Sequence, residues 1–276
     1  MIAAKATAAH ARALPLYYAA MHAAKALSAA YGDDHKPRGH GLLQASRVVL
    51  ADVMDFEIKP APGPSVLSTL YDVTESGRLE GPVSLGRLFL SLPDLAEKPH
   101  VIAGPRALYL EEVAANRVRD PTLHVVVETG GVAADLWDVD YAELDGWYKN
   151  SDDDATVTSR RQPGTLFGRL VDVRDRPTAL QELAPTYRFS GARWLIPNID
   201  GTSGRLSPLV TWYALLFGFS ILARYEPDTW LAALDVRQQH AVAIEAALEE
   251  ATAALPELVW KHIGTQLAEE RLREKG

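Results

Sequence analysis

The segment from Leu209 to Ala223 constrains the fold of this chain more than any other, because nearly all of its 15 residues are apolar. A helix of this length spans about 22 Å, which is short of the roughly 30 Å hydrocarbon core of a membrane. Acidic residues follow the segment closely. We therefore expect no membrane span but a buried central helix, with Ser207 and Pro208 at its start and Pro227 after its end.

The start of the chain predicts further helices, because fourteen of its first thirty residues are alanine. One helix is predicted to end near Leu14 and a second to open with Pro15, since proline is tolerated in a first helical turn. Gly32 is a suitable carboxy-terminal cap for the second helix. So much alanine on several faces indicates that other helices approach closely on more than one side.

The middle of the chain carries strand signals, namely β-branched residues bounded by glycine and proline. The predicted strands are residues 48–58, 107–110, 123–129, 165–173 and 187–196. Ser84 is predicted to cap a short helix that stops at Pro93. We expect an irregular antiparallel sheet.

From Leu206 onward the pattern is helical again. Residues 236–255 form an amphipathic stretch, and Pro256 is predicted to start a last helix. One stripe of this stretch consists of Val236, His240, Ile244, Leu248 and Thr252. No Gly/Ser linker is long enough to separate independent domains.

Residues 17–42 resemble the paired-helix signature of HEPN domains (higher eukaryotes and prokaryotes nucleotide-binding). In that signature a helix that begins with tyrosine ends in a glycine loop, which a His-Gly turn follows. The residues that carry the resemblance here are Tyr17, Tyr18, His22, Lys25 and His40. More broadly, the chain is similar to the bacterial YaaC-like proteins in this segment, in residues 84–95 and in residues 206–230.

The resemblance implies an α+β fold in which a helical bundle, formed by the N- and C-terminal helices, holds an inserted antiparallel, strand-rich middle. Residues 1–47 would be the HEPN-like half of the bundle, residues 48–205 the insertion, and residues 206–276 the helices that complete the bundle. We expect one cooperative unit. The resemblance also implies a homodimer formed through the helices.

Positive charge gathers in the second half of the predicted insertion. Residues 156–205 hold eight arginines, no lysine and four acidic residues, a net charge of +4, although the whole chain carries −8. Arginine binds phosphate through paired hydrogen bonds, so we expect this stretch to contact RNA or a protein partner. The residues expected to make the contact are Arg160, Arg161, Arg169, Arg174 and Arg176. Alternatively, these arginines pair with the acidic stretch just upstream.

One histidine has an arginine at the spacing found in active HEPN ribonucleases, in which four to six residues on a helix separate the two. The resemblance implies metal-independent cleavage of RNA, with the histidine handling protons and the arginine stabilising the charge on the phosphorane. His124 has this spacing from Arg119, with four residues between, and from Arg117, with six between. Pro121 lies between them and a run of valine follows, so the pair is predicted at a turn entering a strand, where the family has a helix.

No metal site and no cofactor are expected. The chain has no cysteine, which excludes disulfides, thiolate ligands and a cysteine nucleophile, and suits a reducing cytoplasm. Asp33, Asp34, His35 and His40 lie near one another in the sequence, but their spacing matches no common zinc or calcium site.

Two hypotheses of different classes follow. In the first, the chain is an HEPN-derived binding or scaffold protein of the bacterial cytoplasm, with RNA or a protein as its partner. In the second, it is a metal-independent endoribonuclease, a toxin or phage-defence effector, with Arg119 and His124 as catalytic residues. A small-molecule or nucleotide-binding regulator is a third alternative, to which the sequence assigns no residue.

Overall fold

The structure is a computed structural model that describes residues 9–31, 39–45, 52–95, 98, 102, 107–114, 123–128, 148–149, 157–158, 165–170, 186–189 and 192–273. Contacts group the chain into two compact units. We call residues 1–103 and 199–276 the helical unit, and residues 104–198 the sheet unit. Helices and antiparallel strands together make the fold α+β, as the sequence predicts.

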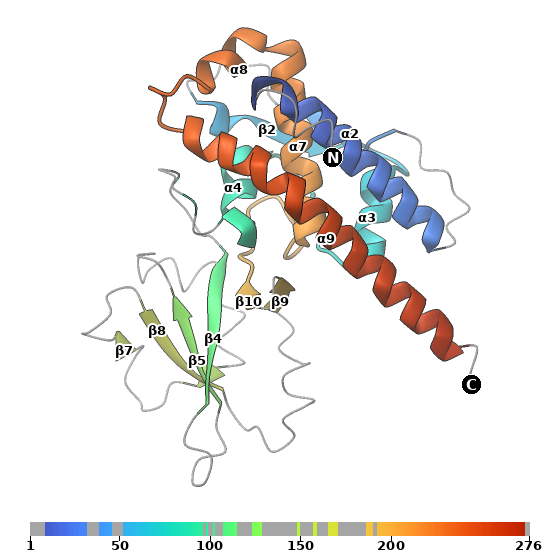
Figure 1. Cartoon of the computed structure of the whole chain (residues 1–276), viewed down its shortest axis with the longest axis vertical. Coiled ribbons are helices and arrows are strands. Elements are labelled where there is room, and N and C mark those ends of the chain that lie inside the picture. The colour runs from blue at the N-terminus through green and yellow to red at the C-terminus, as the bar shows by residue number, and fades with distance from the viewer. Residues whose placement is uncertain are drawn as a thin grey trace. The chain divides into compact units, whose positions relative to one another are not determined.

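The helical unit combines segments from both ends of the chain (Figure 1). Its helices are α2 (Ala9–Ala30), α3 (Val66–Thr74), α4 (Leu85–Leu90), α7 (Pro208–Tyr225), α8 (Pro227–Ala233) and α9 (Ala241–Arg273), with the short 3-10 turns η1 (Val53–Asp55) and η2 (Pro93–Leu95). Its strands β1 (Leu42–Gln44), β2 (Glu57–Pro60) and β3 (Val83–Ser84) form a small antiparallel sheet in that order. The strand predicted at residues 48–58 is therefore wrong in most of its described part, which forms η1 and only the start of β2.

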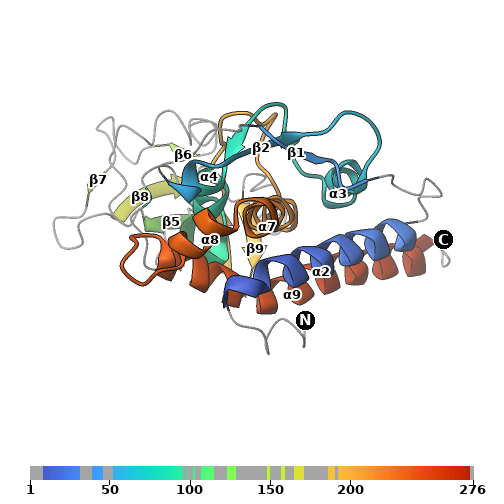
Figure 2. The ribbon, with the colours of Figure 1, turned by 90° about the horizontal axis from the view of Figure 1, so that it is seen from above.

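Helix α7 is the core of the helical unit, as the sequence predicts. Every residue from Pro208 to Leu222 is buried, and α2, α3, α4, α8 and α9 all contact the helix. Figure 2 shows α7 nearly end-on, with α2 and α9 on one side and β1 and β2 on the other. By length and composition α7 could cross a membrane, but 83% of it is buried inside the protein, as in the core helix of a globular protein.

The predicted helix starts at Pro15 and Pro256 are wrong. Pro15 lies inside α2 and Pro256 lies inside α9, so the chain continues as one helix through each proline. A proline inside a helix removes one hydrogen bond and strains the preceding turn. Tertiary packing outweighs this penalty, because α2 packs against both α7 and α9. The Tyr31 hydroxyl also donates to the His262 carbonyl of α9 at 3.2 Å.

The sheet unit contains one antiparallel sheet. Its strands are β4 (Leu108–Ala114), β5 (Leu123–Glu128), β6 (Tyr148–Lys149), β7 (Val157–Thr158), β8 (Thr165–Leu170), β9 (Thr186–Phe189) and β10 (Ala192–Leu195). The strand order is β6-β8-β5-β4-β10-β9, and β7 also pairs with β8. Strands predicted at residues 107–110, 123–129 and 165–173 correspond to β4, β5 and β8, whereas the single strand predicted at residues 187–196 is the antiparallel pair β9 and β10.

Candidate functional site

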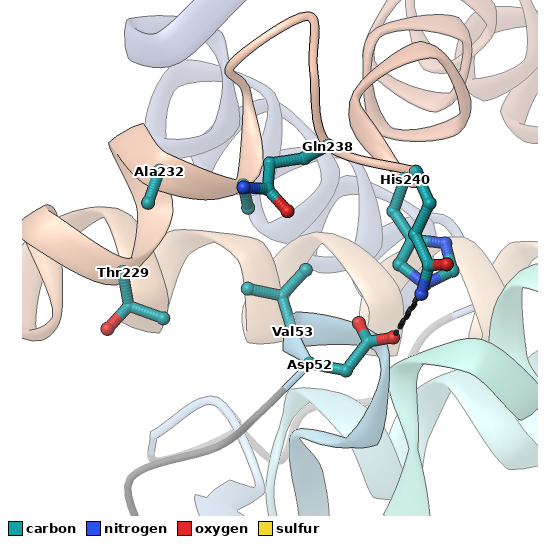
Figure 3. A pocket seen from close by; sticks show the side chains of 8 residues that line it. Asp52, Val53, Thr229, Ala232, Gln238 and His240 are labelled. Carbon is teal, nitrogen blue, oxygen red and sulfur yellow. Dashed lines mark hydrogen bonds and ion pairs between the residues drawn. The ribbon is translucent and has the colours of Figure 1, made fainter.

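Asp52 and His240 form an acid–histidine pair in the helical unit (Figure 3). Oδ2 of Asp52 lies 2.6 Å from Nε2 of His240, and only 8% of the histidine side chain and 23% of the aspartate side chain are exposed. A distance this short requires one proton between the two atoms, because otherwise two acceptors would face each other. The pair joins segments that are 188 residues apart in the chain.

Local hydrogen bonds hold both residues in place. Asp52 precedes η1, and its Oδ1 accepts a hydrogen bond from the Met54 amide at 2.8 Å. His240 directly precedes α9, and its carbonyl accepts from the Ile244 amide at 2.9 Å. Nε2 of Gln239 donates to Oδ2 of Asp52 at 3.3 Å. Each carboxylate oxygen therefore has a partner, and the histidine backbone is fixed by the helix that follows it.

Two hollows meet at this pair. The first hollow has a volume of about 320 Å³ and is otherwise lined by Val53, Thr229, Ala232, Ala233 and Gln238. The second hollow has a volume of about 350 Å³ and is otherwise lined by Met54, Asp55, Ser84, Gly86, Arg87 and Ile102. Asp52, Gln239 and His240 border both. Each volume lies at the lower end of the range for small-molecule sites.

Two residues that border the second hollow each hold a buried nitrogen without a hydrogen-bond partner: Nδ1 of His240 and Nη1 of Arg87. Buried polar atoms in proteins are nearly always paired, so two unpaired nitrogens at the edge of one hollow are unusual. The Arg87 backbone is fixed, because its amide donates to Oγ of Ser84 at 3.3 Å at the start of α4.

The arrangement around Asp52 and His240 favours binding over acid–base catalysis. One ring nitrogen of His240 is held by Asp52 and the other is buried, so neither is presented to a substrate. The Ser84 hydroxyl, which borders the second hollow, already accepts a hydrogen bond as the cap of α4. A ligand in either hollow would meet fixed polar groups and no activated nucleophile.

Two of the five family-signature residues, Tyr17 and His40, lie against α7. The Tyr17 ring lies 5.6 Å from the Phe217 ring and 5.8 Å from the Tyr213 ring. The His40 ring lies 4.9 Å from Phe217, and the Tyr213 hydroxyl donates to the His40 carbonyl at 2.8 Å. The Tyr18 ring lies 5.6 Å from that of Tyr17. These contacts indicate that the signature fixes the packing of α2 and the residues before β1 on α7.

Burial controls the ionisation of this aromatic cluster. It raises the pKa of Tyr17 and the pKa of Tyr213 above the usual tyrosine value. Burial also lowers the pKa of His40, and the nearby charge of Arg224 lowers it further. At pH 7 all three side chains are therefore neutral.

In the sheet unit, the predicted catalytic His124 lies on β5, whereas Arg119 falls outside the described residues. In the strand register His124 lies opposite Arg169 of β8, and Arg169 lies opposite Lys149 of β6. On its other side, His124 lies opposite Val113 of β4. Residues opposite each other in neighbouring strands occupy the same face of a sheet. Three basic residues thus form one row across β5, β8 and β6.

Two of the remaining predicted positions lie in the described part of the chain. His22 and Lys25 are exposed on α2. The residues that fall outside the described ranges are Arg160, Arg161, Arg174, Arg176, Asp33, Asp34 and His35. Within the described ranges, no group of three or more His, Cys, Asp or Glu residues is arranged to hold a metal ion.

The sequence prediction did not include Asp52, Arg87 or His240 among its site residues. His240 did fall on the apolar stripe with Ile244, and the structure shows both buried there. A histidine on such a stripe needs a polar partner, which is a usable signal. Nothing in the sequence points to Asp52 as this partner, because the two residues are 188 positions apart.

Comparison with known proteins gives one match. The sequence model of a family described as YaaC-like Protein matches residues 1–263. No curated protein and no solved structure matches the chain significantly. The family match extends over nearly the whole chain, through the segments that form both units. The chain therefore belongs to the YaaC-like protein family.

Proposed function

We propose that the protein is a non-catalytic binding protein of the bacterial cytoplasm that contacts RNA through its sheet unit. The observation that supports this proposal is the register of Lys149, Arg169 and His124 across β6, β8 and β5. Neighbouring strands lie about 4.8 Å apart, so basic residues in such a row can follow a phosphate backbone.

The charge distribution along the chain also supports RNA as the partner. Residues 156–205 carry a net charge of +4, and β8 lies inside this stretch. The other arginines proposed for the contact flank β8 in sequence and are Arg160, Arg161, Arg174 and Arg176. On β4 the residue opposite His124 is Val113, so the basic row is confined to β5, β8 and β6. Glu111 of β4 lies two rows along, opposite Val126.

Binding of a fluorescently labelled single-stranded RNA to the full-length protein tests the proposal, measured by anisotropy at several salt concentrations. We expect Arg169→Glu to weaken binding about tenfold or more at low salt and to reduce the salt dependence, because a phosphate contact becomes a repulsion. Arg237→Glu is the matched control, since the Arg237 side chain is 88% exposed and belongs to the helical unit. Unchanged binding by Arg169→Glu would exclude the sheet row as the RNA site.

A second function, that of a metal-independent endoribonuclease, is favoured by the direct pairing of His124 with Arg169. This pairing supplies a histidine and an arginine from neighbouring strands, in place of the predicted pair of Arg119 and His124. The expected activity is cleavage of single-stranded RNA in EDTA that is lost in His124→Ala. Retained cleavage in that variant would eliminate His124 as the catalyst. Cleavage would also support a role as a toxin or phage-defence effector.

The proposal further includes that the protein is an HEPN-derived scaffold. It is supported by the packing of α2 against α7 and α9, which brings helices from the first and last thirds of the chain into contact. In an HEPN-like protein these helices would form the bundle and the homodimer interface. Light scattering of the protein as it elutes from a size-exclusion column tests the dimer. A monomer at a protein concentration of tens of micromolar would contradict the dimer.

A further inference from the structure

We propose that the second hollow binds a small zwitterion of amino-acid size, with one carboxylate and one ammonium group. This ligand site belongs to the helical unit and does not depend on the RNA contact proposed for the sheet unit. Three features of the hollow support the inference: its walls, a cationic group that borders it and an anionic group that borders it.

Three segments that are distant in sequence build the walls. Met54 and Asp55 come from η1, Gly86 and Arg87 from α4, and His240 from the residue before α9. The contact between η1 and α4 is close, because a Cβ on Gly86 would lie 3.3 Å from the Met54 carbonyl oxygen. The Asp52–His240 pair joins the third segment to η1. The hollow therefore has fixed walls, as a preformed ligand site requires.

The cationic group is the Arg87 guanidinium. Its Nη1 is buried without a hydrogen-bond partner. Its Nη2 lies 4.0 Å from Oδ2 of Asp200, at the limit of an ion pair, and the Asp200 side chain is fully exposed at 100%. A guanidinium that is partly buried and incompletely paired is best satisfied by a carboxylate, which accepts two parallel hydrogen bonds.

The anionic group is the Asp55 carboxylate. Asp55 borders the same hollow as Arg87, and within the described part of the chain it makes no ion pair. Asp52 differs, because the Met54 amide occupies its Oδ1, and His240 and Gln239 occupy its Oδ2. A simple anion would be attracted by Arg87 and repelled by Asp55, and a simple cation would meet the reverse. A zwitterion complements both charges.

Isothermal titration of the full-length protein with the twenty standard amino acids tests the inference, with propionate and propylamine as analogues that carry only one charge. We expect at least one amino acid to bind the wild type, and both analogues to bind about tenfold more weakly or not at all. Arg87→Gln and Asp55→Asn should each weaken that amino acid about tenfold or more, since each removes one charged contact.

Arg237→Gln and Asp228→Asn make the same charge changes on exposed residues outside the second hollow, and they should leave binding unchanged. Circular dichroism establishes that each variant is folded, and Asp55→Asn alters an exposed side chain. The inference is overturned if no amino acid binds, if neither Arg87→Gln nor Asp55→Asn weakens binding, or if propionate binds as tightly as the amino acid. Each of these results leaves the RNA proposal intact, because Arg169→Glu reports on the sheet unit.

Discussion

Gly77 shows at the scale of a single residue how the two halves of the helical unit are joined. Its amide donates to the Arg205 carbonyl at 2.8 Å, between a segment that follows α3 and one that precedes α7. A Cβ at this position would lie 2.5 Å from the Gly204 carbonyl carbon and 2.8 Å from the Arg205 carbonyl oxygen. These are backbone atoms, so they cannot give way as the end of a flexible side chain can.

We expect Gly77→Ala to lower the free energy of unfolding by about 2–3 kcal/mol, because the two segments must move apart. Gly81→Ala is the matched control, since a Cβ there would meet Cα of Gly201 at 3.6 Å, an ordinary contact. Its effect should stay within about 1 kcal/mol. Urea denaturation followed by circular dichroism measures both, and equal losses would show that backbone crowding at Gly77 is not the cause.

Residue roles that depend on the local sequence were predictable, and those that depend on distant contacts were not. Oγ of Ser84 and Oγ of Ser207 accept from the amides three residues on, as predicted for the starts of α4 and α7. The partner of His240 could not be predicted, because Asp52 comes near it only through the contact between α8 and η1. The candidate ligand site depends on this long-range contact.

Among the elements, the helices that contain proline show the limit of local signals. The residues before a proline can be similar whether the proline lies at the first position of a helix or inside one. What differs is the packing of other elements against the helix. Pro227 follows the end of α7, as predicted, and starts α8. Pro256 lies inside α9, where Leu255 and Leu258 on either side of it are buried in the core. The prediction of α7 was correct because a run of apolar residues this long favours only a buried position.

We expect Pro256→Ala to raise the free energy of unfolding by about 2 kcal/mol. Alanine restores the amide that the Thr252 carbonyl lacks, and Pro256 is exposed, so no packing is lost. Pro227→Ala should instead lower stability slightly, by about 0.5 kcal/mol, because the first helical position needs no amide and the unfolded chain gains freedom. Thermal and urea unfolding measure both variants, and a destabilised Pro256→Ala would mean that α9 depends on a bend at this residue.

For the whole molecule, the sequence predicted that the end segments are helical and the middle strand-rich, and the α+β structure agrees. The predicted insertion began at residue 48, so the prediction separated residues 52–95 from the terminal helices. In the structure these residues group with the terminal helices. Strands of two to four residues, such as β1, β2 and β3, are too short for an alternating pattern to indicate which unit they join. Cooperative unfolding of the two units remains a prediction.

Two buried titratable groups in the helical unit give the whole protein opposing responses to pH. Asp94 accepts a hydrogen bond from Nε1 of Trp212 at 3.0 Å, yet burial raises the pKa of its carboxyl to about 6, with Glu250 and Glu257 adding to the effect. Burial and, to a smaller extent, the charge of Lys261 lower the pKa of His262 to about 4. Folding therefore favours the neutral form of both groups.

Between pH 4 and pH 6.5, Asp94 and His262 change the free energy of unfolding in opposite directions. The contribution of Asp94 is fully present below its unfolded pKa of 3.8 and is lost as the pH rises through about 6. The contribution of His262 is present above its unfolded pKa of 6.5 and is lost as the pH falls through about 4. In the wild type the two slopes partly cancel, so stability should vary little across this range.

Asp94→Asn should separate the two effects, because the amide oxygen can still accept from Trp212 but carries no charge. We expect the variant to exceed the wild type in free energy of unfolding by about 2 kcal/mol at pH 7 and to approach it at pH 4. The remaining slope, from His262, then makes the variant lose stability as the pH falls. Urea denaturation between pH 4 and 7.5 measures this, with Asp228→Asn as the exposed control. A constant difference between Asp94→Asn and the wild type at every pH would show that the Asp94 carboxyl titrates alike in the folded and unfolded chain, and that its burial against α7 does not shape the acid response of the molecule.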